Sequence, residues 1–497
     1  MESSFIEELD NCIRARFTVI CVVSLEEESI LEQLRTLCTH TNRRLYRWDH
    51  ADYFQVLCGD GAAPNAKDPL SALNAIEHMD NDAIVALCDF HQCWHGQPRV
   101  VRKLRNLAAN LKFSRKTVII TAPTWKIPDE LRDEIVVMDF PAPGLAEMEL
   151  ILSSLTSAAG VKINLTPAGR EKLLQAALGL SCSQARRVFS RAIVAKGGLD
   201  ERDIDSVNAA KKQIIRDFGA LEFFSPSETI SDVGGLNNLK EWLRTREKAF
   251  SKEARTYGLP EPKGIALIGI PGTGKSLTAK MIAGLWRLPL VRLDLGALFG
   301  SFVGQSEENT RRALSVAEII SPCILWIDEI EKGLSVSGGD GGTSMRVFAG
   351  ILSWMQEKTK PVFVVATANN IALIPPELMR KGRVDEVFFL DLPTFQERQE
   401  IFEVHLRKRR RPVQNYDLDR LAQASQGFVG AEIEQAVIDA MYYAFSDRQE
   451  PGRDFTTDDI LMALEKQVPI SRSHRETIDE LRKWLSEGRA QSASLPE

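Results

Sequence analysis

Residues 264–276 combine an apolar strand, a glycine-rich loop and a lysine–serine pair in the order that chemistry on a phosphate chain requires. They read Gly-Ile-Ala-Leu-Ile-Gly-Ile-Pro-Gly-Thr-Gly-Lys-Ser. The glycines let the backbone approach an anion, so that successive N–H groups and the N-terminus of the next helix face its oxygens. Lys275 reaches the β- and γ-phosphates, and the Ser276 hydroxyl is a ligand for Mg²⁺. The pattern therefore predicts a site for ATP and Mg²⁺.

The apolar strand before this loop and the helix-forming run at 279–285 after it disfavour the alternative, a chance match within a flexible loop. We expect the nucleotide to contact the end of the strand, the loop and the first turn of the helix. These residues are Gly269, Ile270, Pro271, Gly272, Thr273, Gly274, Lys275, Ser276 and Leu277.

Two further strands are expected to bring polar side chains to the same edge. The apolar run Cys323-Ile-Leu-Trp-Ile ends in Asp328 and Glu329, and the strand at 362–367 leads to Asn369. Strands of a parallel sheet deliver such residues to its C-terminal edge, where ligands bind. We expect Asp328 to hold Mg²⁺, Glu329 to be the base that polarises the attacking water, and Asn369 to sense the γ-phosphate. A strand that simply ends in acid is the alternative.

Arg380 and Arg383 follow on a loop, within Leu378-Met-Arg-Lys-Gly-Arg. Their planar guanidinium groups could reach a phosphate bound to a neighbouring subunit. Taken alone, they could equally be a pair of solvated surface arginines.

The ordered set of motifs resembles the AAA ATPases, within the AAA+ class, over about residues 228–470. The resemblance is carried by Asp232-Val-Gly-Gly, the phosphate loop, Ser301-Phe-Val-Gly-Gln-Ser-Glu, Asp328-Glu329, Asn369, Arg380-x-x-Arg and Gly430-Ala-Glu-Ile. Within it, Trp326-Ile-Asp-Glu-Ile-Glu-Lys, Ser353-Trp-Met-Gln-Glu and Arg380-Lys-Gly-Arg look like the AAA proteins first noted as a chloroplast and cyanobacterial reading frame. That family carries a long N-terminal region of similar size.

This resemblance implies several roles. Asp232, Val233 and Gly234 would border the adenine, Asn369 would be sensor 1, and Arg380 and Arg383 would be arginine fingers acting in trans. His405 matches the histidine that approaches adenine and ribose in that clade, although a plain lid histidine fits the sequence nearly as well. The sensor 2 position holds Ala431 instead of arginine.

Phe302 and Val303 lie between Gly300 and Gly304, where an apolar core residue would be oddly placed. In the AAA proteins that the chain resembles, an aromatic residue followed by an apolar residue and glycine lines the pore and holds an extended polypeptide. The resemblance therefore implies a substrate-gripping loop, and a second loop at 335–342. The alternative is that Phe302 packs against its own domain.

The whole chain has the composition of a globular protein of several domains. Its 497 residues include 26% charged and 44% hydrophobic residues, with a net charge of −6 that gives no general attraction to nucleic acid. The apolar runs are strand-length, and the N-terminus is acidic, which predicts no membrane segment and no signal peptide. Eight cysteines, several in apolar strands, favour reduced thiols. We expect a cytoplasmic protein.

Residues 1–215 alternate strands and helices, and one passage parallels the second half of the chain. Residues 118–131 align with 365–378, and Met138-Asp-Phe-Pro aligns with Leu390-Asp-Leu-Pro. After the strand at 17–23, however, the chain reads Ser-Leu-Glu-Glu-Glu, whose carboxylates would repel a triphosphate. We therefore expect a degenerate, nucleotide-free copy that serves docking or assembly. Two unrelated α/β domains are the alternative.

A Cys/His cluster and a basic run could suggest a metal site and a nucleic-acid site, but neither pattern supports one well. Cys88-Asp-Phe-His-Gln-Cys-Trp-His lacks the ligand spacing of a metal finger, and a strand end points its alternate residues in opposite directions. The basic run 406–412 could touch nucleic acid, but without interleaved aromatic residues a solvated face of the lid is favoured. A DNA motor would rest on this run alone.

The predicted fold is α/β, a P-loop AAA+ parallel sheet with a helical lid, preceded by a degenerate AAA-like α/β domain. The predicted boundaries are 1–215 for the degenerate domain, 216–235 for a linker, 236–395 for the large ATPase subdomain, 396–470 for the lid, and 471–497 for a C-terminal helix and tail. The predicted function is an ATP hydrolase that forms a homo-oligomeric, hexameric ring and remodels an unidentified protein substrate. The alternative is a nucleotide-switched scaffold with slow hydrolysis.

Overall fold

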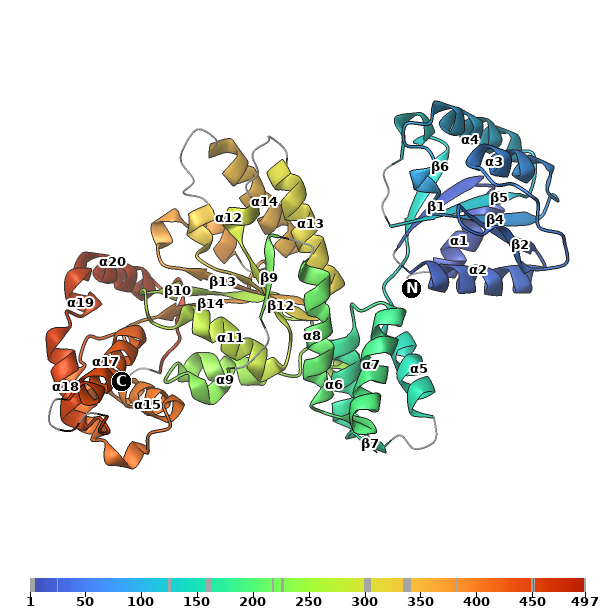
Figure 1. The fold of residues 1–497 in the computed structure, drawn as a ribbon. Coiled ribbons are helices and arrows are strands. Elements are labelled where there is room, and N and C mark those ends of the chain that lie inside the picture. Colours follow the sequence, from blue (N-terminus) through green and yellow to red (C-terminus); the bar gives the residue numbers. More distant parts are fainter. Residues whose placement is uncertain are drawn as a thin grey trace. The chain divides into compact units, whose positions relative to one another are not determined.

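The chain forms two compact units, residues 1–147 with 181–184, and residues 148–180 with 185–497. Figure 1 shows the computed structural model of the chain. It describes residues 5–24, 26–123, 127–157, 162–216, 219–224, 228–298, 305–333, 341–380, 382–447, 450 and 452–495. Phe302 and Val303, predicted to line a pore, lie outside the described residues, as does most of the predicted second loop.

The first unit is built on a six-stranded sheet with the order β3-β2-β4-β5-β1-β6. All neighbouring strands are parallel except β3, which runs antiparallel to β2 at one edge. Its strands are β1 (Val19–Val23), β2 (Arg44–Asp49), β3 (Tyr53–Cys58), β4 (Ala83–Cys88), β5 (Thr117–Ala122) and β6 (Ile135–Asp139). The central strands β4 and β5 are buried throughout because helices cover both faces of the sheet.

Two apolar layers hold these helices on the first sheet. One layer joins the sheet to α1 (Phe5–Arg14) and α2 (Glu27–Thr41), and the other joins it to α3 (Pro69–His78) and α4 (Pro98–Leu111). Figure 1 shows the two helix pairs on opposite faces. Each helix has its apolar residues on one side, as in α4, where Val100, Leu104, Leu107 and Leu111 are buried.

The second unit repeats this strand order in its larger sheet. The order is β15-β14-β10-β13-β12-β11-β9, so that β11, β12, β13, β10 and β14 correspond in sequence and in space to β2, β4, β5, β1 and β6. The edge strand β9 is antiparallel to β11, as β3 is to β2. The strands are β9 (Leu221–Phe224), β10 (Gly264–Gly269), β11 (Leu290–Leu293), β12 (Cys323–Ile327), β13 (Val362–Ala368), β14 (Glu386–Leu390) and β15 (Gln491–Ser492).

Helices again cover both faces of this sheet (Figure 1). One face carries α9 (Asn237–Thr245) and α11 (Lys275–Trp286). The other carries α12 (Leu295–Leu298), α13 (Gln305–Ile319), α14 (Gly341–Glu357) and, from the C-terminal region, α20 (Arg475–Ser486). After α20 the chain returns to the sheet edge, where the Ala493 N–H donates to the Phe389 carbonyl at 2.9 Å and the Ala493 side chain is fully buried. The predicted C-terminal tail therefore contributes a strand.

The helical segment that lies between the two sheets in the sequence belongs mostly to the second unit, although residues 145–147 and 181–184 are grouped with the first. It contains α5 (Leu145–Thr156), α6 (Pro167–Ala177), α7 (Cys182–Lys196), α8 (Asp203–Arg216) and the short strands β7 (Lys162–Asn164) and β8 (Gly198–Asp200). Lys211 on α8 is fully buried, and its ammonium group donates to the Ile320 carbonyl at 3.0 Å. This contact joins α8 to the end of α13 in the second unit. Compact packing therefore divides the chain near residue 147, whereas our predicted first domain runs to residue 215.

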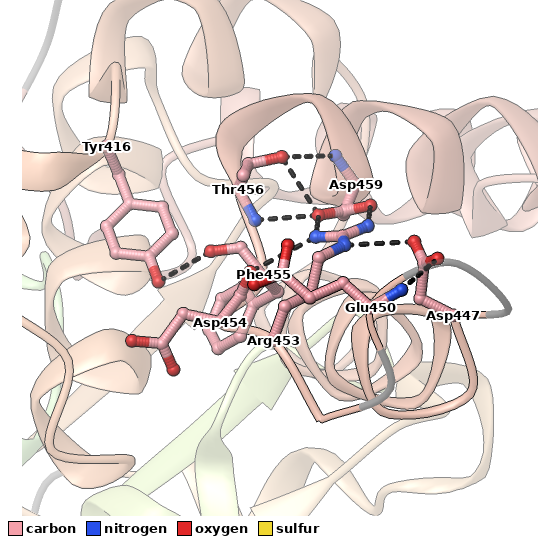
Figure 2. A network of polar contacts seen from close by, with 8 residues as sticks. All are labelled: Tyr416, Asp447, Glu450, Arg453, Asp454, Phe455, Thr456 and Asp459. Atoms are coloured by element: carbon pink, nitrogen blue, oxygen red, sulfur yellow. Dashed lines mark hydrogen bonds and ion pairs between the residues drawn. The ribbon is translucent and has the colours of Figure 1, made fainter.

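The lid is a separate helical layer with its own apolar core. Its main helices are α15 (Phe395–Lys408), α16 (Leu418–Ala424), α17 (Gly430–Phe445) and α18 (Thr457–Lys466), followed by the short α19 (Ile470–Ser473). Figure 2 shows the ionic network that fixes the start of α18, in which Arg453 contacts both oxygens of Asp459 at 2.7 and 2.8 Å. The Arg453 guanidinium lowers the pKa of Asp459 to about 2.

The predicted α/β class, with a parallel P-loop sheet, a helical lid and a preceding α/β domain of the same topology, is confirmed. The predicted alignment of residues 118–131 with 365–378 ends on Leu131 and Leu378. Each of these leucines lies in a 3₁₀ turn after the corresponding strand, and both are buried. Among the described residues, no helix is both long and apolar enough to cross a membrane.

Candidate nucleotide-binding cleft

A cleft with a volume of about 460 Å³ lies where the C-terminal edge of the second sheet faces the lid. It brings together residues just before α9, the phosphate loop, the ends of β12 and β13, and helices α15 and α17. Its lining includes Asp232, Val233, Gly234, Pro271, Gly272, Thr273, Gly274, Lys275, Ser276, Leu277, Asp328, Glu329, Thr367, Asn369, His405, Ala431 and Glu434. Residues as far apart in the sequence as Asp232 and Glu434 thus meet at one surface.

The phosphate loop occupies residues 270–274, between the end of β10 and the start of α11. Gly272 and Gly274 have φ values of 84° and 91°, the left-handed region that side chains rarely adopt. A Cβ atom on Gly272 would lie only 2.7 Å from the Val429 side chain of the lid. Both conformation and space therefore require glycine here, and the loop can expose its backbone to a ligand.

Lys275 is buried beneath the loop, with 7% of its surface exposed. Its ammonium group donates to the carbonyl oxygens of Gly269 at 2.9 Å and Ile270 at 2.8 Å. Burial lowers the pKa of Lys275 to about 8, although the nearby carboxylate of Glu331 and those of Asp328 and Glu329 oppose this effect. Gly269 and Ile270, which we predicted as nucleotide contacts, do not line the cleft and instead hold this lysine.

Asp328 is tied to its surroundings by two hydroxyl groups. Its Oδ1 atom accepts from Thr367 Oγ1 at 2.7 Å and from Ser276 Oγ at 3.3 Å. Thr367 also accepts from the backbone N–H of Glu329 at 2.9 Å. A carboxylate beside hydroxyl groups supplies the oxygen ligands that Mg²⁺ prefers, with room for its waters, so these residues fit the ion.

Glu329 is held at the cleft by its backbone and by its side chain. Its φ of 47° is a left-handed conformation that a non-glycine residue adopts rarely, which turns the chain directly after β12. Its Oε1 atom accepts from Asn369 Nδ2 at 3.0 Å, and its Oε2 atom pairs with the ammonium group of Lys332. The two residues predicted to handle water and γ-phosphate are therefore in direct contact.

Sequence reasoning missed two residues that line this cleft and one that lies beneath it. Thr367 links Asp328 to Glu329, and Glu434 lies beside His405. Glu331, beneath the cleft with 6% of its surface exposed, accepts from the Asn369 backbone N–H at 2.8 Å. A signal existed for Glu331, because it follows the predicted acids by two residues, but its burial could not be read from spacing.

The opposite end of the cleft has the composition of a nucleoside pocket. Gly234 packs so closely on α15 that a Cβ atom would lie 2.7 Å from the Ile401 backbone nitrogen. His405 is buried, and its Nδ1 atom lies 3.4 Å from Glu434. Burial lowers the pKa of His405 to about 4 despite Glu434, so the imidazole is neutral near pH 7 and can donate or accept a hydrogen bond.

Arg380 and Arg383 do not line the cleft of their own chain. Arg380 is exposed, and Arg383 donates to the Glu377 carbonyl at 2.7 Å. Their action on a neighbouring subunit remains a prediction.

The basic run of the lid is largely paired within the lid. Arg409 contacts Glu434 at 3.2 Å, Arg411 contacts Asp454 at 2.9 Å, and Arg407 pairs with Glu403. These ion pairs reduce the charge that the run could offer to nucleic acid. In the part of the chain that the structure describes, no three or more His, Cys, Asp and Glu side chains group as a metal site.

Family models match four stretches of the chain. The N-terminal domain of SpoVK-like AAA ATPases matches residues 5–140, and the second domain of that group matches residues 146–217. The ATPase family associated with various cellular activities (AAA) matches residues 265–392, and the AAA+ lid domain matches residues 415–461. Two models therefore divide the stretch that we predicted as one domain.

Curated relatives extend along the whole chain. The uncharacterized AAA domain-containing protein ycf46 of Trieres chinensis is 44% identical over 497 residues, which cover 99% of this chain and 98% of that protein. Its counterpart in Guillardia theta is 42% identical over 502 residues, covering 99% and 97%. The proteasome-activating nucleotidase of Saccharolobus islandicus is 32% identical over 272 residues, covering 52% and 67%.

Proposed function

This chain belongs to the AAA family of ATPases, and we propose that it is a Mg²⁺-dependent ATP hydrolase that forms a hexameric ring and remodels a protein substrate. The observation that carries the proposal is the contact of Asp328, Glu329 and Asn369 at one end of the cleft, next to the phosphate loop. Hydrolysis of ATP needs positive charge on the phosphates, a base and a group that positions the γ-phosphate. Glu329 and Asn369 would serve as the base and the positioning group, and Lys275 with a Mg²⁺ ion held by Asp328 would supply the charge.

Lys275 and the loop would bind the phosphate chain. The lysine already lies beneath the loop, so only its two carbonyl partners must be exchanged for phosphate oxygens. Ser276 and Asp328 would hold Mg²⁺, which when bound neutralises charge that develops on the phosphates. Thr367 keeps the Asp328 carboxylate oriented toward Ser276.

Glu329 would accept a proton from the attacking water. To do so it must leave Lys332, and Asn369 can follow the γ-phosphate because its amide both donates and accepts. The backbone bond from Glu329 to Thr367 keeps the residue at the sheet edge while its side chain moves. Binding of the γ-phosphate would thus exchange the contact of Glu329 with Lys332 for one with the attacking water.

Arg380 and Arg383 would complete the site of a neighbouring subunit. The support is their position outside their own cleft. Mixing an Arg380→Ala subunit with a Lys275→Ala subunit tests the idea, because each is inactive alone but a shared interface would contain one intact site. Recovered hydrolysis is expected if the two forms co-assemble, and co-assembly without recovery would contradict action in trans.

A protein substrate is the remaining part of the proposal. It is supported by the similarity to a proteasome-activating nucleotidase and by the aromatic loop sequence around Phe302. We expect Phe302→Ala to keep basal ATP hydrolysis and to lose substrate-stimulated hydrolysis and remodelling. Unimpaired remodelling would instead favour the nucleotide-switched scaffold, and loss of basal hydrolysis together with misfolding would make Phe302 a core residue.

A further inference from the structure

The first unit contains a cationic cavity that is independent of the nucleotide cleft. It has a volume of about 260 Å³ and lies at the N-terminal edge of the first sheet, opposite to the end where β1 meets α2. Thr18, just before β1, and Thr117, at the start of β5, lie side by side there, since Val118 N–H donates to the Thr18 carbonyl at 2.9 Å. The loops before these two strands form the cavity wall.

Arginine dominates the lining of this cavity. Arg14, Arg16, Arg43 and Arg115 line it together with three hydroxyl side chains, and among its described lining residues there is no carboxylate. Lys116 also contributes, but its ammonium group is already bonded to the carbonyl oxygens of Glu77 at 2.6 Å and Met79 at 3.0 Å. The guanidinium groups therefore set the chemistry of the cavity.

These arginines are only partly neutralised within the described residues. Arg14 lies 3.7 Å from Asp10, and Arg115 lies 3.8 Å from Asp82, distances too long for good hydrogen bonds. The Nη1 atom of Arg43 is buried and has no hydrogen-bond partner in the described structure. A buried donor without a partner is costly, and a bound anion would satisfy it.

The negative C-terminal ends of nearby helices could also neutralise these arginines, but their charge is too small. Helices α1, α2 and α4 end near this edge at Arg14, Thr41 and Leu111. Each C-terminus carries about −0.5 charge, so together they would neutralise roughly one and a half cations. The four arginines exceed that amount, even before the hydroxyl groups are considered.

From this cavity we infer that the first unit binds a small ligand bearing a diphosphate or two phosphate groups. Guanidinium forks match phosphate oxygens in pairs, and the neighbouring hydroxyls can donate to the remaining oxygens. The volume is smaller than the 460 Å³ of the nucleotide cleft, which suits phosphate groups better than a whole nucleotide.

Single-stranded nucleic acid is the rival ligand. Phe113, 92% exposed, and Phe17, 44% exposed, stand in the same loops as Arg115 and Arg16, and exposed aromatic residues beside cations can stack bases. Acidic residues outnumber basic ones within residues 1–147, however. That surplus opposes the approach of a long polyanion more than that of a small ligand.

The test measures pyrophosphate binding to the full chain by calorimetry. A Lys275→Ala background removes the main phosphate contact of the nucleotide cleft, and Arg14→Gln with Arg115→Gln removes charge from the cavity. Both arginines are exposed by more than 70%, so the fold should persist, which circular dichroism would check. Arg132→Gln, at an exposed arginine of the same unit that pairs with Asp129, is the matched control.

We expect one saturable site in the Lys275→Ala background, weakened at least about tenfold by the cavity pair and unchanged by the control. Arg43→Gln should weaken it as well, and orthophosphate should bind less tightly than pyrophosphate. Absence of binding, unchanged binding in the cavity pair, or equal loss in the control would each overturn the inference. Much tighter, steeply salt-dependent binding of a single-stranded oligonucleotide that the same arginines control would overturn it in favour of nucleic acid.

Discussion

The two sheets of this protein share a strand order but differ at the helix that follows the corresponding strands β1 and β10. In the second sheet, residues 270–274 form a glycine loop before α11, whereas in the first sheet only residues 24–26 separate β1 from α2. At the start of α2, Glu27 accepts from Thr121 Oγ1 at 3.1 Å and lies 3.8 Å from the Arg47 guanidinium. The first sheet therefore places its own carboxylate where the second leaves room for phosphate.

This difference teaches that topology supplies the position of a site and the loop supplies its chemistry. A helix N-terminus attracts an anion in both sheets. At the N-terminus of α2 the negative charge comes from the protein's own side chains. A phosphate group there would be repelled by Glu26, Glu27 and Glu28 and would find no glycine loop. In α11 the N-cap is Gly274 and the nearest cation is Lys275, so the attraction remains available to a ligand.

The largest effect is expected from removing Glu329, the proposed general base at the second sheet. We expect Glu329→Gln to lower the turnover of ATP by roughly 10²–10⁴-fold while ATP stays bound, because the phosphate loop and Asp328 are unchanged. Steady-state hydrolysis and equilibrium nucleotide binding measure the two parts. Glu28→Gln, an exposed acid at the corresponding helix of the first sheet, should leave turnover unchanged, and a comparable loss there would erase the distinction between the sheets.

Replacing Lys275 of the phosphate loop tests whether the first unit binds no nucleotide. We expect the full chain to bind one nucleotide and Lys275→Ala to bind none, because only the second sheet has a cradle. Equilibrium dialysis with labelled ATP gives the stoichiometry directly. Substantial binding that survives Lys275→Ala and maps to the first unit would show that the carboxylate at α2 does not exclude nucleotide.

The buried lysine also makes nucleotide affinity depend on pH. Its pKa of about 8 lies below the ordinary value of 10.5, so above pH 8 the empty cleft holds a neutral amine that must regain a proton to bind phosphate. We expect affinity for ATP to fall roughly tenfold between pH 8 and 9.5, with proton uptake measurable by calorimetry in buffers of different ionisation enthalpy.

Two controls accompany this pH prediction. Lys275→Arg keeps its charge in this range, so any affinity that it retains should not vary with pH. In the folding equilibrium, the unfolded chain binds more protons at Lys275 between pH 8 and 10.5, so this residue makes the free energy of unfolding rise with pH there. A pH-independent affinity in the unsubstituted chain would contradict a titrating lysine.

The smallest expected effect concerns the carboxylate of the first sheet. Glu27→Gln weakens the contacts with Thr121 and Arg47, and we expect it to lower the free energy of unfolding of the first unit by about 1 kcal/mol. Denaturant titration followed by circular dichroism measures this. Glu28→Gln shares the same helix turn but is exposed, so an equal loss in both variants would assign the effect to the helix dipole alone.

Much of the candidate site could be predicted because it is local in the sequence. The phosphate loop requires glycine and lysine within a few residues, and acids directly after an apolar strand must emerge at its end. Thr367 and Glu331 escaped prediction for the opposite reason, since their roles arise from hydrogen bonds to residues on neighbouring strands. The contact between residues 211 and 320 likewise has no local signal in the sequence.

By itself, the sequence determined where a phosphate chain can be cradled and that the first sheet lacks such a cradle, because both depend on residue types within one short turn. Other contacts depend on the tertiary structure. The Lys275 ammonium group donates to two carbonyl groups, Thr121 donates to Glu27 from 94 positions away, and the end of the chain pairs as β15 with β14. The tertiary structure also gathered Arg43 and Arg115 around one cavity. Strand pairing brings distant residues together, and no local spacing encodes which strands become neighbours.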